Sequence, residues 1–264
     1  MTAEPHPVPA PRGRRRPVRA VVVAVPVRDE ERRVRACLRS VLAAAARVPL
    51  PVVVAVALDR CVDGSRAAVE AVLGGRPGTL VVELGPAPRR TVAEVRDAAV
   101  TAGLALARRR RPVATDELWV AGTDADTVVP PGWLVEQVRR ADAGADLVAG
   151  AVDLDDDPGL DRPARERYAR LVRPRDGVGG EEHGHVYGAD LGVRASAWRA
   201  AGGFPRVDSG EDAALLDAVA AAGGVVVRPT WPRAVTSGRT RGRADGGLAD
   251  LLADLAGPGR VPSG

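Results

Sequence analysis

Two aspartates one residue apart give the sequence its sharpest chemical signal. Asp124 and Asp126 come directly after an apolar stretch, residues 118–122, that has the pattern of a buried strand. In parallel α/β sheets, ligands collect beyond the carboxyl ends of the strands. Paired carboxylates there are the oxygen ligands that Mg²⁺ and Mn²⁺ prefer. The pair predicts a divalent cation that bridges phosphate oxygens, with a solvated acidic turn as the alternative.

Further acidic residues follow the first two predicted strands. Asp29 and Glu30 come after residues 20–26, and Asp59 and Asp63 come after residues 52–58. In a parallel sheet these positions share the edge of Asp124, where carboxylates can accept hydrogen bonds from a base N–H or a ribose hydroxyl. Helix capping explains Glu30 and Asp63 equally well. Asp59 has no obvious cap to make, so we predict a binding role for it.

A third acidic pair, Glu211 and Asp212, stands at the start of a helix expected over residues 210–222. An acid in a first helical turn is usually a cap. Beside a metal-bound diphosphate, however, one of the two becomes a candidate general base. Gly210 permits the tight turn that would let the following acids face a cleft.

The remaining candidates are histidines, an acidic loop and an arginine-rich segment. His183 and His185 lie in the Gly-rich stretch 177–188. For them we favour contact with a second substrate (an acceptor) or loop packing over metal ligation. Residues 153–159 resemble a calcium loop, but Pro158 and Ala164 stand where that loop needs Gly and Glu, so a solvated loop is expected. Residues 239–243 hold three arginines that either fold over a diphosphate or form a solvated tail.

The elements that would position these residues alternate between strands and helices. Apolar runs bounded by turns predict strands, and periodic apolar positions predict helices between them. A capping box at Thr91 and Glu94 starts one of these helices. The pattern favours a parallel α/β sheet. The expected strands are 20–26, 52–58, 80–84, 118–121 and 145–152, followed by helices 162–172, 210–222 and 248–255 and a short strand at 225–228.

Composition sets the outer limits. The 264 residues make one large domain or two packed halves, and 45% of them are hydrophobic. Two cysteines exclude a disulfide scaffold and a four-Cys zinc site. The net charge of +4 equals that of the first 20 residues (five Arg minus one Glu), so nucleic-acid binding gains little support. No apolar run reaches the roughly 18–20 residues of a membrane span, and we expect a cytoplasmic protein whose basic tail allows weak membrane-surface contact.

The order of these motifs resembles that of family 2 glycosyltransferases. Five segments carry the resemblance, and two positions depart from it, since Arg28 and Asp190 stand where Asn is commoner. The Q-x-x-R-W motif of processive polysaccharide synthases is absent, which favours transfer of a single sugar. The five segments are Val25-Pro26-Val27-Arg28-Asp29-Glu30-Glu31, Asp59-Arg60-Cys61-Val62-Asp63-Gly64-Ser65, Asp124-Ala125-Asp126, Gly188 to Arg194 with Gly202-Gly203-Phe204, and Gly210-Glu211-Asp212.

The resemblance implies a GT-A fold, a Rossmann-like α/β unit with a mostly parallel central sheet flanked by helices. It implies a nucleotide-sugar half at 19–152 and an acceptor half at 153–235. It also implies a nucleotide-sugar donor, an acceptor hydroxyl and Mg²⁺ or Mn²⁺ as the cofactor. Composition adds the two ends: the Pro- and Arg-rich residues 1–18 are expected to be a basic disordered tail, and the Gly- and Arg-rich residues 236–264 a flexible segment with a short helix.

Roles carry over from the resemblance position by position. Asp59 would read the base, Asp124 would contact ribose or metal, and Asp126 would bind the metal. Asp212 would deprotonate the acceptor and give inversion, with Glu211 as the second candidate. The other implied contacts are Pro26, Asp29, Glu30, Asp63 and Arg96 for the nucleotide sugar, and His183, His185 and Asp190 on the acceptor side.

Two rival functions fit part of the pattern. A sugar-phosphate nucleotidyltransferase also places an Asp-x-Asp at a sheet edge, but it usually has a Gly-rich loop and a Lys after the first strand. In this chain the segment after the first predicted strand, residues 26–31, contains no Gly, and the whole chain contains no Lys. A non-catalytic nucleotide-sugar-binding module would bind donor and metal without turnover.

Overall fold

The computed structural model describes residues 15–87, 89–172, 183, 186–242 and 247–257. Its centre is a seven-stranded sheet in which only β7 runs antiparallel to its neighbours. An α/β fold with a mostly parallel central sheet is therefore confirmed. The strand order is β3 (Thr79–Leu84), β2 (Val52–Asp59), β1 (Ala20–Val27), β4 (Leu118–Gly122), β7 (Leu191–Arg194), β5 (Leu147–Ala149) and β8 (Val226–Val227).

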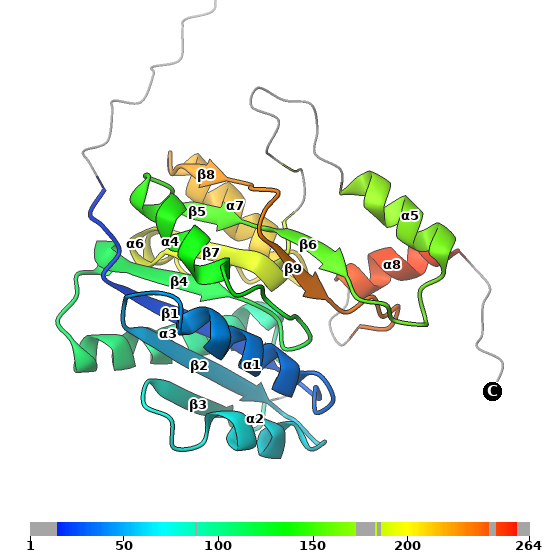
Figure 1. Cartoon of the computed structure of the whole chain (residues 1–264), viewed down its shortest axis with the longest axis horizontal. Coiled ribbons are helices and arrows are strands. Elements are labelled where there is room, and N and C mark those ends of the chain that lie inside the picture. The colour runs from blue at the N-terminus through cyan, green and yellow to red at the C-terminus, as the bar shows by residue number, and fades with distance from the viewer. Residues whose placement is uncertain (1–14, 88, 173–182, 184–185, 243–246, 258–264) are drawn as a thin grey trace, which may run out of the picture.

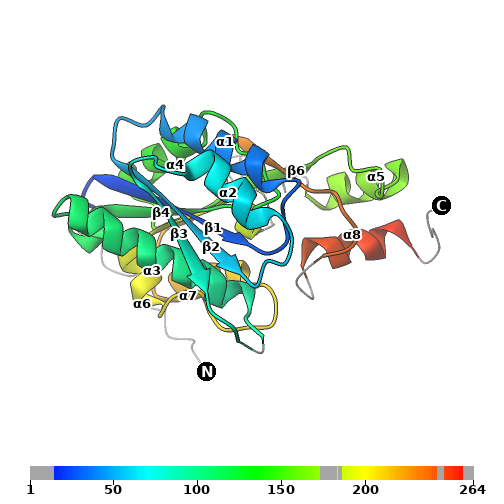
Figure 2. The same cartoon turned by 90° about the horizontal axis from the view of Figure 1, so that it is seen from below.

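Helices cover both faces of this sheet, as Figures 1 and 2 show. One face carries α1 (Val34–Ala45), α2 (Ser65–Leu73) and α4 (Trp133–Asp142), and the other carries α3 (Val92–Arg110), α6 (Ala195–Ala200) and α7 (Glu211–Ala221). Alternate side chains of β1 enter two separate apolar cores, one under each helical layer. Burial on both faces explains why this strand is a continuous apolar run. The capping box predicted at Thr91 and Glu94 starts α3.

A smaller unit projects beside the sheet. Strands β6 (Ala151–Leu154) and β9 (Arg233–Thr236) form a parallel pair, and α5 (Arg162–Leu171) packs against α8 (Leu248–Ala256). Figure 1 shows both helices at one end of the molecule. Tyr168 and Leu252 anchor their shared apolar cluster. No helix in the described part of the chain has the length and apolarity needed to cross a membrane.

The structure corrects the strand expected over 145–152. It divides at Gly150 into β5, which lies antiparallel to β7, and β6, which leaves for the second sheet. The Gly150 N–H donates to the carbonyl of Asp190 at this point. The sequence pattern also did not predict strand β7, which lies within Gly188–Arg194. In both places the pairing partners are distant in sequence: β7 lies antiparallel between β4 and β5, and β6 pairs in parallel with β9.

The acidic loop after β6 is solvated only in part: Asp156, Pro158 and Gly159 are exposed, but two of its carboxylates are bound. Arg33 of α1 donates to the carboxylates of Asp155 and Asp157, and the Gly238 N–H donates to Asp155 at 2.8 Å. These bonds join the loop to α1 and to the segment after β9.

Candidate active site

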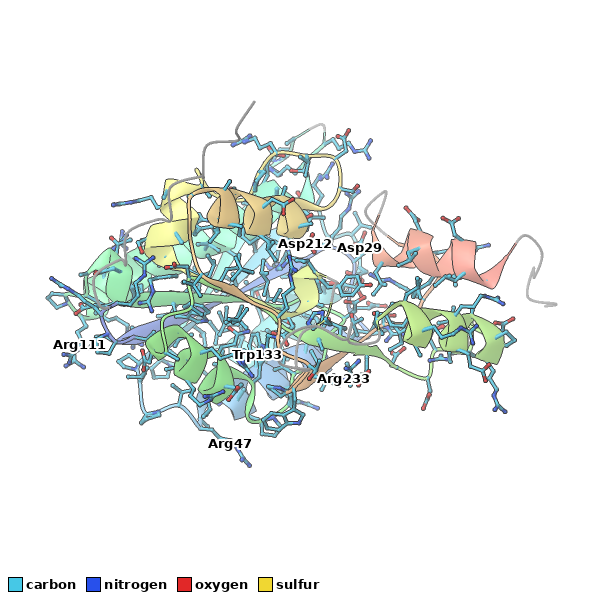
Figure 3. All side chains as sticks on the ribbon, turned by 90° about the horizontal axis from the view of Figure 1, so that it is seen from above. Asp29, Arg47, Arg111, Trp133, Asp212 and Arg233 are labelled. Atoms are coloured by element: carbon cyan, nitrogen blue, oxygen red, sulfur yellow. The ribbon has the colours of Figure 1, made fainter. Side chains whose placement is uncertain are left out.

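A cleft of about 690 Å³ opens at the carboxyl ends of β1, β2 and β4. In Figure 3, Asp29 and Asp212 lie toward the end of the sheet from which α5 and α8 project, and Arg111 lies at the opposite end. The cleft brings together eight of the predicted site residues. These are Pro26, Glu30, Asp59, Arg96, Asp124, Asp126, Glu211 and Asp212.

Asp59 lies at one end of the cleft between two arginines. It is 2% exposed, and its carboxylate accepts hydrogen bonds from Arg60 at 2.9 Å and from Arg90 at 3.0 Å. Burial pushes the pKa of Asp59 upward, but these hydrogen bonds and charges outweigh burial and hold the pKa below its ordinary value. Arg60 has a left-handed backbone (φ 48°), which is uncommon for a residue other than Gly, Asn or Asp. The sequence predicted Asp59 but not its partner Arg90, which lies on the segment before α3.

Asp124 and Asp126 stand at the end of β4 with different partners. Asp124 accepts a hydrogen bond from Arg96 at 2.5 Å, and Asp126 pairs with Arg239 at 3.0 Å. Arg239 also donates to Glu30 at 2.6 Å. Of the Arg-rich segment, Arg239 therefore contacts this site, Arg241 is exposed, and Arg243 lies outside the described residues.

The crowding of carboxylates here fits a cation site. Burial, with the charges of Asp124 and Glu30, raises the pKa of Asp126 to about 6, although Arg239 and Arg33 oppose the rise. A cation between these acids would relieve that repulsion, and the guanidinium of Arg239 occupies this role in the structure. A divalent ion that uses Asp126 must therefore compete with Arg239.

Glu211 and Asp212 open α7 across the cleft. Gly210 adopts φ 75° just before them, a conformation that Gly reaches without strain, as the sequence suggested. Asp212 accepts hydrogen bonds from the Gly188 N–H at 2.6 Å and the Ala213 N–H at 2.7 Å. Burial and the charge of Glu211 raise the pKa of Asp212 to about 6, while Arg96 and the two N–H groups lower it. A carboxylate in this state suits proton transfer near neutral pH.

Two predicted contacts tie loops together instead of lining the cleft. Asp29 accepts from the Val62 N–H at 2.8 Å, and Asp63 accepts from the Glu31 N–H at 3.1 Å and the Ser65 N–H at 2.9 Å. Among the described residues, the ligand atoms of Asp29, Asp63 and Cys61 also lie within 4.8 Å of one another. Both carboxylates are already occupied by backbone donors that cross-link the loops after β1 and β2.

Two residues predicted for the acceptor side, Asp190 and His183, do not line the cleft. Asp190 is buried below the cleft, where it accepts from Trp133 at 2.6 Å and from Gln137 at 2.9 Å. Burial raises its pKa to about 7, against these hydrogen bonds. His183 is buried with its Nε2 3.1 Å from the Ala149 carbonyl, and His185 lies outside the described residues. At this end the described lining consists instead of side chains that the sequence did not single out: Val186, Tyr187, Asp208, Leu248 and Leu251.

The comparisons with known proteins agree with this geometry. The family model "Glycosyl transferase family 2" matches residues 22–198, more than half of the chain. The chain belongs to glycosyl transferase family 2. The matched range contains the Asp59 end of the cleft and the Asp124–Asp126 pair, and it ends before Glu211 and Asp212. No sequence among the curated proteins matches this family 2 member.

Comparison with solved structures identifies the fold of this family 2 chain. It superposes on S. aureus TarS residues 1–349 in complex with UDP-GlcNAc with a TM-score of 0.58, at 15% identity over 85% of this chain and 60% of that one. It also superposes on the mannosyltransferase PcManGT from Pyrobaculum calidifontis, in complex with GDP-Man and Mn²⁺, with a TM-score of 0.57, at 20% identity over 84% of this chain and 58% of that one. The GT-A fold is thereby confirmed. The chain spans about three fifths of the length of each neighbour.

Proposed function

We propose that this protein transfers one sugar from a nucleotide-diphosphate sugar to an acceptor hydroxyl, with inversion at the anomeric carbon. The arrangement that supports this most is a single cleft with an Asp-x-Asp pair on one wall and Asp212 on the other. Inverting transfer needs both features, a site for the diphosphate and a base on the far side of the sugar.

The donor would bind along the strand ends. Asp59 can accept an N–H of the base, and Arg90 beside it can donate to a carbonyl of the base. Asp126, with Asp124, would hold Mg²⁺ or Mn²⁺ after Arg239 has moved from Asp126. That ion would neutralise the diphosphate as it leaves. PcManGT carries GDP-Man with Mn²⁺ in its structure, which agrees with a metal in a cleft of this fold.

The chemical step would depend on Asp212. Its carboxylate accepts the proton of the acceptor hydroxyl as the oxygen forms a bond to the anomeric carbon. The bond from that carbon to the diphosphate oxygen breaks at the same time, and the nucleoside diphosphate departs with the bonding electrons. Glu211 is held by Arg96 at 3.0 Å, which leaves Asp212 as the better candidate for the base.

Incubation with a panel of nucleotide sugars and Mn²⁺ tests this function. Release of a free nucleoside diphosphate, with an acceptor product of opposite anomeric configuration, is the expected result. Release of pyrophosphate would instead identify a nucleotidyltransferase. Donor binding with no turnover across a broad mixture of hydroxyl acceptors would identify a binding module. Thermal shift with the same panel identifies the donor, because a ligand that binds only the folded state raises the unfolding temperature.

A further inference from the structure

Arg96 of α3 is enclosed between the two walls of the cleft. The residue is 3% exposed, although it contributes to the lining of the cleft next to Asp124 and Glu211. Its charge sits between the wall that would bind the donor and the wall that would hold the base. A nucleotide contact was expected here, and the burial argues for a different role.

All three guanidinium nitrogens of Arg96 are engaged by the protein. Nε donates to Glu211 at 3.0 Å, one terminal nitrogen donates to the Gly188 carbonyl at 3.1 Å, and the other donates to Asp124 at 2.5 Å. The guanidinium also lies 5.9 Å from the centre of the Phe204 ring. Such a planar fork with fixed donors holds several acceptors in one geometry, which a Lys ammonium cannot reproduce.

Gly188 is shaped around this side chain. A Cβ at residue 188 would lie 2.0 Å from a terminal nitrogen of Arg96, so only Gly admits the guanidinium. The same Gly188 donates its N–H to Asp212. Arg96 therefore fixes both neighbours of Asp212, the Gly188 peptide on one side and Glu211 on the other.

From this geometry we propose that Arg96 is a positioning residue for the general base: it fixes Asp212 through Gly188 and Glu211 and ties that base to the donor wall through Asp124. This inference rests on the proposed function, in which Asp212 is the base. Within the described residues, the charged and titratable groups placed near Asp212 are Glu211 on α7, Arg96 on α3, Tyr187 before Gly188, and Asp208 on the cleft wall. Among these groups of the described chain Arg96 is the cation, and its charge favours the ionised base together with the Gly188 and Ala213 N–H groups.

Two substitutions separate the charge of Arg96 from its shape. Arg96→Lys keeps a positive charge but not the three-way fork. We expect kcat to fall about tenfold, with the acid limb of the kcat–pH profile unmoved. Arg96→Gln removes the charge as well, so the pKa of Asp212 rises and the acid limb moves up by about one pH unit. Arg90→Gln is the matched control, because Arg90 lines the cleft beside Asp59, and it should weaken donor binding without moving the limb.

A second measurement does not need turnover. The side-chain carboxyl ¹³C signal of Asp212, assigned with Asp212→Asn, should titrate at higher pH in Arg96→Gln than in the wild type. An unchanged titration, or full activity of Arg96→Lys, would overturn the proposal. So would a loss of donor affinity in Arg96→Gln as large as in Arg90→Gln with the acid limb in place. If the wild type turns over no nucleotide sugar, the proposed function fails, while the Asp212 titration still decides the link to Arg96.

Discussion

The two ends of the cleft shift the pKa of an aspartate in opposite directions. Asp59 is enclosed by Arg60 and Arg90, and its pKa is held below the ordinary value. Asp212 is largely buried beside Glu211, and burial and that charge raise its pKa to about 6 although two backbone N–H bonds and Arg96 lower it. A carboxylate that stays ionised suits binding, and one that titrates near neutrality suits proton transfer. The surroundings, and not the residue type, divide the two roles.

Substitution of Asp212 is expected to have the largest effect on turnover. Asp212→Asn keeps the shape and removes the basicity, so turnover should fall about 10²–10⁴-fold. Donor affinity should barely change, because Asp212 lies across the cleft from the Asp-x-Asp pair. Steady-state kinetics and calorimetry with the donor measure the two quantities. Asp208→Asn, an exposed acid of the same wall, is the control and should lose less than tenfold.

The alternatives for the base give distinct patterns. Near-normal turnover of Asp212→Asn with a large loss in Glu211→Gln would make Glu211 the base. If both variants stay active, the reaction is retaining or is not glycosyl transfer, and the contrast between the two ends loses its meaning.

The second effect concerns the metal pair. Asp126→Ala should remove the Mn²⁺-dependent part of nucleoside diphosphate binding, a loss of at least tenfold or about 1.4 kcal/mol. Calorimetric titration with and without Mn²⁺ measures it. Asp156→Ala, an exposed acid in the loop after β6, should leave the titration unchanged. Equal affinity in Asp126→Ala and the wild type would contradict a metal at this pair.

At pH 7.5, substitution of Asp212 and of Asp59 should change the unfolding temperature in opposite directions. The pKa of Asp212 is raised in the fold, so its favourable contribution is lost as pH rises through about 6, and Asp212→Asn should unfold at a higher temperature. The pKa of Asp59 is lowered, so its contribution is complete above the unfolded-state pKa and disappears as pH falls through the folded-state value. Asp59→Asn should therefore unfold at a lower temperature, with a deficit that shrinks in acid.

Thermal unfolding from pH 3 to pH 8 measures both changes. Each kcal/mol corresponds to a shift of about 2–4 °C in a protein of this size. If the unfolding temperatures of Asp212→Asn and Asp59→Asn shift in the same direction, the two aspartates do not have oppositely shifted pKa values.

The smallest expected effect concerns Arg239. Because its guanidinium pairs with Asp126 and Glu30, it competes with a divalent ion for the same oxygens. Arg239→Ala should bind Mn²⁺ several-fold more tightly in the absence of donor, as measured by calorimetry. Arg241→Ala removes a nearby exposed charge and should have a much smaller effect. Equal changes in both variants would mean that only the long-range charge matters.

The sequence by itself determined the alternation of strands and helices, and with it the gathering of Asp59, Asp124 and Asp126 at one edge. The physical reason is local, since buried strands read as apolar runs and parallel strands end on the same side. The turn at Gly210 was predictable in the same way, because a positive φ favours glycine.

Only the tertiary structure decided which side chains neutralise those acids. Arg90 lies just before α3, Arg96 lies within it, and Arg239 follows β9. The sequence spacing of 28 residues between Arg96 and Asp124 says nothing of their 2.5 Å contact. The division of residues 145–152 between two sheets and the burial of Asp190 under Trp133 were equally hidden. A chain of 38 arginines offers many partners for each carboxylate. Distances through space, fixed by packing, select among them.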